Sequence, residues 1–117
     1  MAQCEQCEHS RPPQYIRRGT TPKQIFTFDD LTDLASLDTM LITYAQRGTI
    51  ILEREKDAMT IEEQTVWFRL TQEETLSLQL RAPVEIQVRA IANDGTALAS
   101  DIFEVPVERI LNEEVLT

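Results

Sequence analysis

The residues best suited to chemistry lie at the start of the chain. Cys4 and Cys7 form a Cys-x-x-Cys pair, and His9, the one histidine, follows two residues later. Zinc sites in proteins use four ligands, and thiolates at this spacing wrap one ion in a tight backbone turn. The fourth ligand would come from Glu5, Glu8, a water or the cysteines of a second chain. A redox role needs thiols at a helix N-terminus in a βαβ context, which this acidic stretch does not offer.

Residues 1–14 hold an adjacent proline pair and no large apolar side chain after the first residue. Such a segment buries little, so we expect a flexible tail followed by a single domain over residues 15–117. Three interpretations of the tail stay open: an inert segment, a metal site and a redox pair. We expect no cofactor, with zinc at the two cysteines and the histidine as the alternative.

The rest of the chain offers no catalytic constellation. Nucleophilic catalysis needs a base beside its nucleophile and a third group that orients the base, and the one histidine lies in the tail. Adjacent carboxylates occur at Glu62 and Glu63, at Glu73 and Glu74, and at Glu113 and Glu114. Neighbouring residues on a strand face opposite sides, so such pairs do not share a substrate. We therefore expect a protein that is not an enzyme.

The composition describes a small acidic domain. The 117 residues include 20 Asp+Glu against 11 Lys+Arg, for a net charge of -9. This length suits one hydrophobic core. Because negative charge repels phosphate backbones, we do not expect nucleic acid as a partner. Apolar runs are about 3 residues long against the roughly 20 that cross a bilayer, and no apolar signal core is present, so neither a membrane partner nor a secretion signal is expected.

Apolar residues recur with a period of two from Tyr15 onward, which is typical of strands. Turn residues at 46–48 and at 93–96 predict two hairpins. The expected strands are Lys23–Phe28, Met40–Ala45, Thr49–Glu53, Met59–Ile61, Thr65–Leu70, the run from Val84 to Ala90, and a last strand with Phe103, Val105 and Val107 on one face. About seven such strands with turns between them indicate an antiparallel β-sandwich rather than a βαβ fold.

Helical structure is expected only as short turns. Thr71 followed by Glu74 matches a capping box and predicts one helical turn. Residues 29–38 predict a helical turn or a compact loop, and residues 110–117 a short helix or a tail. The expected core consists of Phe26, Phe28, Tyr44, Leu52, Val66, Phe68, Ile86, Val88, Phe103 and Val105.

A few residues are candidates for contact with a partner. If its neighbours in sequence face the core, Trp67 projects from the outer face of its strand, and tryptophan is enriched at interface hot spots. The alternatives are that a bulge turns it into the core or that a loop covers it. Ile91 and Ile102 are expected on the outer faces of the final hairpin. Arg17 and Arg18 form a basic pair that serves either solubility or contact with an acidic subunit.

Three stretches carry a family resemblance: YIRRGTTPKQIFTF (residues 15–28), LTQEETLSL (70–78) and PVEIQVRAIANDGTALASDIFEVPVERILNEEVL (83–116). Together they resemble small prophage-encoded proteins, a group that looks like an immunoglobulin-like β-sandwich related to the N-terminal domain of phage baseplate upper proteins. The resemblance implies a component of a virion tail or baseplate. No catalytic residues carry over from such a group, and the cysteine-containing tail lies outside its pattern.

These observations lead to one main hypothesis and two rivals. The main hypothesis is a non-catalytic structural or interaction module of a phage or prophage particle, with phage tail or baseplate proteins or further copies of itself as partners. It would reside in the host cytoplasm during assembly and then in the virion. The rivals are a metal-binding or redox accessory protein that uses the Cys-x-x-Cys pair, and a carbohydrate-binding sandwich that uses Trp67.

Overall fold

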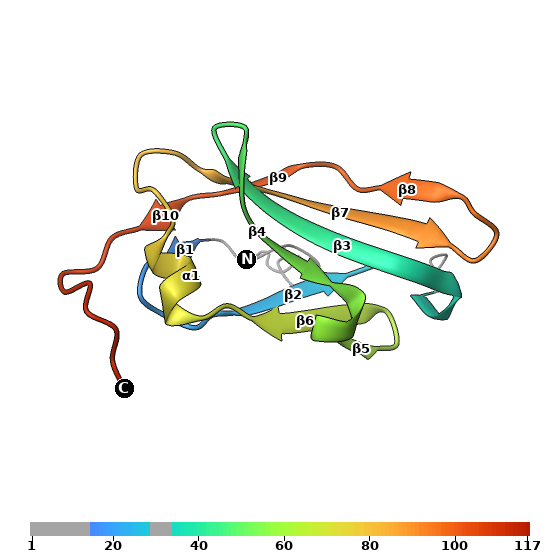
Figure 1. The fold of residues 1–117 in the computed structure, drawn as a ribbon, viewed down its shortest axis with the longest axis horizontal. Helices are drawn as coiled ribbons and strands as arrows, with labels where there is room; N and C mark the ends of the chain where they lie inside the picture. Colours follow the sequence, from blue (N-terminus) through green and yellow to red (C-terminus); the bar gives the residue numbers. More distant parts are fainter. Residues whose placement is uncertain (1–14, 29–33) are drawn as a thin grey trace, which may run out of the picture.

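A computed structural model describes residues 15–28 and 34–117, so Cys4, Cys7, His9 and the first part of the expected turn at 29–38 lie outside the described residues. Within these two ranges, ten strands and three short helical segments follow one another (Figure 1). The strands are β1 (Ile16–Arg17), β2 (Lys23–Thr27), β3 (Leu37–Gln46), β4 (Thr49–Glu55), β5 (Thr60–Glu62), β6 (Thr65–Arg69), β7 (Val84–Ala92), β8 (Ala97–Ala99), β9 (Phe103–Val105) and β10 (Val107–Glu108). The helical segments are η2 (Leu34–Ser36), η3 (Lys56–Ala58) and α1 (Gln72–Leu76).

Two sheets face each other across the core, as the two layers in Figure 1 show. One has three strands in the order β2-β6-β5, and the other has the order β4-β3-β7-β8 with β9 also on β7. All of these pairs are antiparallel. A separate parallel pair joins β1 to β10. The prediction of an antiparallel sandwich with only short helical turns is confirmed.

The strand order is that of an immunoglobulin variable-type domain. Such domains hold strands B, E and D in one sheet and C′, C, F and G in the other. Here β2, β6 and β5 take the first three positions, while β4, β3, β7 and the β8–β9 segment take the other four. The helical turn α1 lies at the E–F crossover. Chain order and pairing together define an immunoglobulin-like β-sandwich.

The last strand departs from the prediction because it is broken into β8, β9 and β10. The partner that follows the 93–96 turn is β8, not the segment with Phe103. At Ser100, the hydroxyl accepts a hydrogen bond from Val88 N at 3.0 Å while Ser100 N donates to Val88 O at 2.8 Å, which interrupts the ladder. Pro106, which lacks an N–H, separates β9 from β10. The break replaces one expected strand by three, and β1 (Ile16–Arg17) is a further strand that was not expected, so the described residues hold ten strands instead of about seven.

Both predicted hairpins are present. Arg47 and Gly48 link β3 to β4 with φ values of 53° and 80°, the two positive angles that a type I′ turn requires. Gly95, with φ of 91°, closes the β7–β8 turn, where its N–H donates to Ala92 O at 2.9 Å. Residues 110–117 form neither a helix nor a strand, in agreement with a tail rather than the short helix.

The core is centred on three rings. Phe26 stacks on Phe68 at 6.0 Å between ring centroids, and Tyr44 meets Phe68 edge-on at 6.3 Å. Seven of the ten expected core residues are buried, namely Phe26, Tyr44, Val66, Phe68, Ile86, Val88 and Val105. Three are only partly buried at its margin, Phe28, Leu52 and Phe103, because they lie near strand ends or on edge strands. The core therefore joins the two sheets through aromatic contacts.

A buried polar pair lies inside this core. The Tyr44 hydroxyl donates to Gln24 Oε1 at 2.7 Å, and both side chains are fully buried. Burial raises the pKa of Tyr44, so the hydroxyl stays protonated and acts as a donor. Among the described residues, Gln24 Nε2 is buried with no hydrogen-bond partner. The amide of Gln24 therefore depends on Tyr44 for its one side-chain bond.

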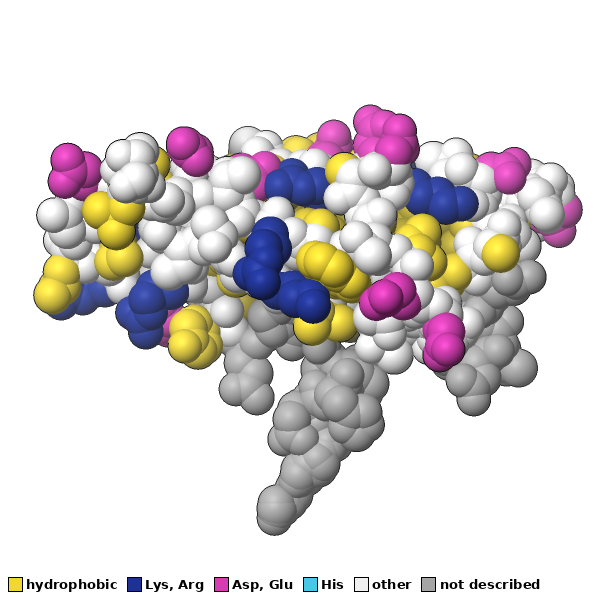
Figure 2. Space-filling model, turned by 90° about the horizontal axis from the view of Figure 1, so that it is seen from below, with side chains coloured by type: hydrophobic (Ala, Val, Ile, Leu, Met, Phe, Trp, Pro, Cys, Tyr) yellow, Lys and Arg dark blue, Asp and Glu magenta, His cyan; other side chains and the backbone are white. Residues whose placement is uncertain are grey.

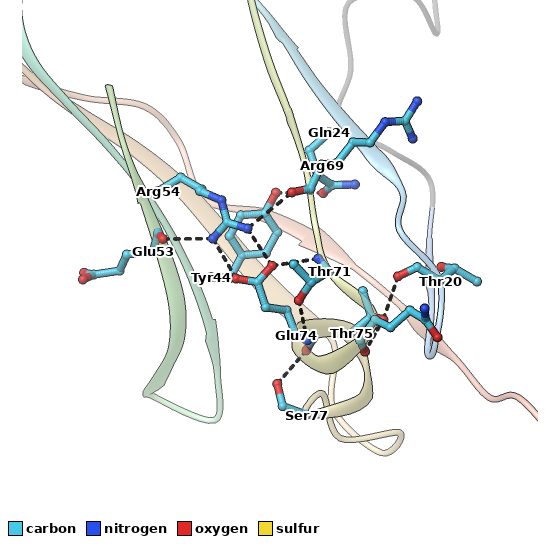
Figure 3. A network of polar contacts seen from close by, with 11 residues as sticks. Thr20, Gln24, Tyr44, Glu53, Arg54, Arg69, Thr71, Glu74, Thr75 and Ser77 are labelled. Atoms are coloured by element: carbon cyan, nitrogen blue, oxygen red, sulfur yellow. Dashed lines mark hydrogen bonds and ion pairs between the residues drawn. The ribbon is translucent and has the colours of Figure 1, made fainter. Parts of the chain in front are cut away.

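An ion pair ties the edge strand β4 to α1 (Figure 3). Arg54 Nη1 and Nη2 donate to the two carboxylate oxygens of Glu74 at 2.8 and 2.6 Å. Glu74 also completes the capping box of α1, because its carboxylate accepts from Thr71 N while Thr71 Oγ1 accepts from Glu74 N. The hydrogen bonds from Arg54 hold the pKa of Glu74 below its ordinary value, and the same bonds raise the pKa of Arg54.

Replacing Glu74 by Gln should lower stability in a pH-dependent way. Gln preserves the cap but loses the charge, so we expect a loss of about 1 to 2 kcal/mol at neutral pH. Because the folded pKa is lowered, the unfolded chain binds more protons below the ordinary value of 4.5, and wild-type stability falls as the pH drops through that window. Between about pH 5 and 3, the free energy of unfolding of the variant, measured with denaturant, should fall less steeply than that of wild type. Glu73→Gln, which alters an exposed carboxylate in the same helical turn, is the control and should follow wild type.

Tyr44→Phe should destabilise the domain by about 1 to 3 kcal/mol, because it leaves the buried Gln24 amide with no partner. A second change, Gln24→Leu, removes that unpaired amide and should restore part of the loss. Urea unfolding of both single variants and the double variant gives the interaction energy. Additive losses would show that the two side chains do not depend on each other.

Candidate protein-interaction surface

The outer face of the three-stranded sheet carries a graded set of side chains. Backbone pairing puts Lys23 beside Arg69, then Ile25 beside Trp67 and Thr60, then Thr27 beside Thr65 and Glu62. These residues alternate with the buried ones along β2 and β6, so they point away from the core. We call this set the β2–β6–β5 face. It is basic at the end near α1, apolar in the middle and acidic at the far end.

Trp67 lies on this face and not in the core, because Val66 and Phe68 on either side of it are buried. The Lys23 ammonium lies over the indole, 4.1 Å from the ring centroid. Trp67 is half-buried, and its neighbour Ile25 is 40% exposed. Regular register with both neighbouring strands rules out a bulge at this position. An aromatic ring, an aliphatic side chain and a cation are therefore in contact on one sheet face.

The charges at the basic end are held in place. Arg69 Nη1 donates to Thr21 O at 3.1 Å, while Lys23 lies over the tryptophan ring. Figure 2 shows the molecule from this side, where dark blue and yellow side chains adjoin at the centre and magenta ones lie mostly towards the rim. The whole chain has a net charge of -9, so the positive charge at this end of the face is opposite in sign to that of the protein as a whole. The face favours an acidic partner.

The two predicted arginines have different environments. Arg17 is exposed, with its guanidinium 5.6 Å from the Tyr15 ring centroid and its Nη1 donating to Arg109 O at 2.8 Å. Arg18 is largely enclosed, forms an ion pair with Glu113 and donates from Nη2 to Leu76 O at 2.7 Å. Arg17 thus remains open to a partner, whereas the Arg18 guanidinium binds groups of its own chain.

The two predicted isoleucines lie away from Trp67. Ile91, 38% exposed, is on the outer face of β7 in the other sheet, where it pairs with Thr39 and Ala97. Ile102, 56% exposed, is not on a strand as expected but in the connection between β8 and β9, because the ladder breaks at Ser100. Trp67 and Ile91 therefore do not form one patch.

The segment of residues 109–117, here called the C-terminal arm, includes the tail expected at 110–117, but its attachment to the domain was not predicted from the sequence. Gln72 of α1 pairs with it, because Nε2 donates to Leu116 O at 2.8 Å and Leu116 N donates to Oε1 at 2.9 Å. Ile110 packs on Gly19, where an added Cβ would lie 3.2 Å from Ile110 Cδ1. Between the arm and the turn after β1 is an open hollow of about 720 Å³, lined by Arg17, Gly19, Arg109, Ile110, Leu111 and Leu116, among others. The sequence signal for such an arm is the pair Glu113 and Glu114 with apolar residues on both sides of it in residues 110–116.

Two findings on the described residues concern metal ligands and membrane-spanning helices. Within residues 15–28 and 34–117, no three His, Cys, Asp or Glu side chains are grouped as metal ligands would be. The predicted ligands Cys4, Cys7 and His9 lie outside those ranges, so zinc binding there stays a prediction. No helix among the described residues is long and apolar enough to span a membrane.

Comparison with known proteins identifies no family. No protein-family model matches the chain. No curated protein matches it either. Among solved structures, the V domain of amphioxus IgVJ-C2 is similar, with 12% sequence identity, a TM-score of 0.35, and coverage of 80% of this chain and 98% of that one. The fold assignment therefore rests on strand order and pairing.

The difference in environment between Arg18 and Arg17 can be tested by measuring the free energy of unfolding of variants at each position. Arg18→Gln should lower the free energy of unfolding by about 1 to 3 kcal/mol, because the Leu76 carbonyl and the Glu113 carboxylate lose their partner. Arg17→Gln, at an exposed site, should change it by no more than about 0.5 kcal/mol. Thermal and urea unfolding of the two variants give the comparison. Equal effects would contradict the assignment of Arg18 as a structural residue.

Proposed function

We propose that this immunoglobulin-like sandwich is a non-catalytic interaction module that binds a protein partner through the β2–β6–β5 face. The observation that carries the proposal is the contact of Lys23 with Trp67 beside the exposed Ile25, on a face that otherwise looks to solvent. Tryptophan and cationic side chains at the centre of a patch are the residues that most often dominate binding energy.

The packing of these residues reduces the cost of binding. Trp67 is fixed by strand pairing on both sides, and Lys23 is already placed over its ring, so neither side chain has to be ordered fully when a partner arrives. Exclusion of water would strengthen the cation–π contact, which is worth about 0.5 to 1 kcal/mol at exposed sites and about 2 when desolvated. A partner with acidic side chains around an apolar centre would match the face.

The same contact favours a protein over a carbohydrate. A sugar ring stacks on the open face of an indole, and in this structure the Lys23 ammonium lies over that ring. A carboxylate from a protein partner would meet the ammonium and Arg69 without displacing Lys23 from the ring.

A more specific form of the proposal places the module in a phage or prophage particle, with tail or baseplate proteins as partners, present in the host cytoplasm during assembly and afterwards in the virion. The sequence resemblance over about residues 15–117 supports this form. Tail or baseplate genes beside the coding sequence, and detection of the chain in purified particles, would support it further. Purified particles that lack the chain would contradict a virion location.

Trp67→Ala should weaken partner capture at least tenfold, because the central side chain of the face is removed. Lys23→Glu should weaken it in a salt-dependent way. Immobilised wild type and variants are compared for the proteins they retain from a lysate of cells that carry the source prophage, identified by mass spectrometry. Ile91→Ala, on the opposite sheet, is the matched control and should retain what wild type retains. Identical capture by wild type and Trp67→Ala would overturn the proposal.

A further inference from the structure

We infer that the C-terminal arm of a second copy of this chain binds the β2–β6–β5 face, so that two copies form a symmetric dimer with two arm–face contacts. This inference rests on the proposed function and names the partner of the same face. Two surfaces of opposite character in one chain carry it: an exposed acidic and apolar arm, and a basic and aromatic sheet face.

The arm exposes side chains that a folded chain normally covers. Leu111 is 88% and Leu116 72% exposed, and Glu114 beside Leu116 is exposed as well. The arm is nevertheless fixed to its own domain, through the ion pair of Glu113 with Arg18 and the two bonds between Gln72 and the Leu116 backbone. These anchors leave the side chains of Glu114 and Leu116 available to another molecule.

The spacing of the two surfaces matches. Glu114 and Leu116 are two residues apart in a segment that is neither helix nor turn, so in extended form they project to one side about 7 Å apart. On β6, Arg69 and Trp67 are also two residues apart and face one side. A carboxylate at Arg69 and Lys23 therefore brings a leucine onto Trp67 and Ile25.

The location of the arm allows each of two copies to place its arm on the face of the other. Figure 1 shows the arm leaving the sandwich at the end where α1 lies and running towards the level of the three-stranded sheet. The basic end of the face is at the same end, because Arg69 is followed within two residues by the cap of α1. Two copies that meet at these ends can each place an arm on the other, and such a two-fold arrangement closes without further growth.

The net charge of the chain decides which experiment can test the arm–face contact. Varying the salt concentration is a poor test, whereas swapping the charges of two residues across the contact is a good one. Each copy has a net charge of -9, so two copies repel at long range while the arm and the face attract locally. Salt weakens both effects. Exchange of one charge between arm and face alters the local contact and leaves the net charge of the doubly substituted chain unchanged.

The experiment measures dimer formation of the full chain by sedimentation equilibrium over a concentration series. Glu114→Lys alone and Lys23→Glu alone should each raise the dimer dissociation constant about tenfold, because each change occurs at both contacts of the dimer. The double variant Lys23→Glu with Glu114→Lys should return the constant to within about threefold of wild type. Leu116→Ser should abolish the dimer.

Two controls separate this contact from general effects. Glu104→Lys changes an exposed charge on β9, and Leu80→Ser changes an exposed leucine between α1 and β7; both should leave dimerisation unchanged. Circular dichroism of every variant confirms folding before comparison. Trp67 fluorescence should shift with concentration in wild type and not in Leu116→Ser.

A wild type that stays monomeric at millimolar concentration, or a double variant that is no better than the singles, overturns the inference. Loss of dimerisation in the two controls overturns it as well. If the chain is monomeric but still captures another protein in a Trp67-dependent way, only the identity of the partner is wrong and the proposed function stands. If Trp67→Ala changes neither self-association nor capture, both fail.

Discussion

The bidentate contact between Arg54 and Glu74 is the interaction that links the most parts of this sandwich to one another. Arg54 belongs to the edge strand β4 of one sheet, and Glu74 belongs to α1, which directly follows β6 of the other. The same carboxylate caps the helix, and the guanidinium lies 5.4 Å from the Phe68 ring centroid in the core. One ion pair therefore fixes the helical turn, the edge of a sheet and one end of the aromatic core (Figure 3).

The two sides of β6 differ because successive side chains of a strand point to opposite faces. Val66 and Phe68 are buried and hold the strand against the opposite sheet, and the residues between them are thereby fixed on the outer side. Trp67 gains a defined orientation without burying its ring in the core. The backbone of the surface proposed for binding is thus paired on strands whose other side packs in the core, which suits a module that acts by contact.

Local patterns in the sequence determine much of this architecture. Alternation predicts the strands and the outward orientation of Trp67, positive-φ turn residues predict both hairpins, and the Thr71–Glu74 spacing predicts the capped turn. A local pattern does not show which distant residue a polar side chain will bind in the folded chain. The burial of Gln24 depends on Tyr44, twenty residues away, and Arg18 differs from Arg17 because Leu76 and Glu113 meet it only in the folded chain. The break at Ser100 arises in the same way, from a hydroxyl that pairs with Val88.

That break also affects how the sandwich responds to cleavage. β7 is paired along most of its length with β3, but on its other side β8 and β9 hold it as two separate short ladders. All three residues of β8 are exposed, whereas β9 contributes the buried Val105 to the core. The β8 ladder can therefore open on its own, at a lower free energy than the rest of the sheet. Of the two segments paired to this side of β7, a protease should therefore cut residues 96–102 before β9, and the nicked chain would stay assembled around the intact pairing of β3, β7 and β9.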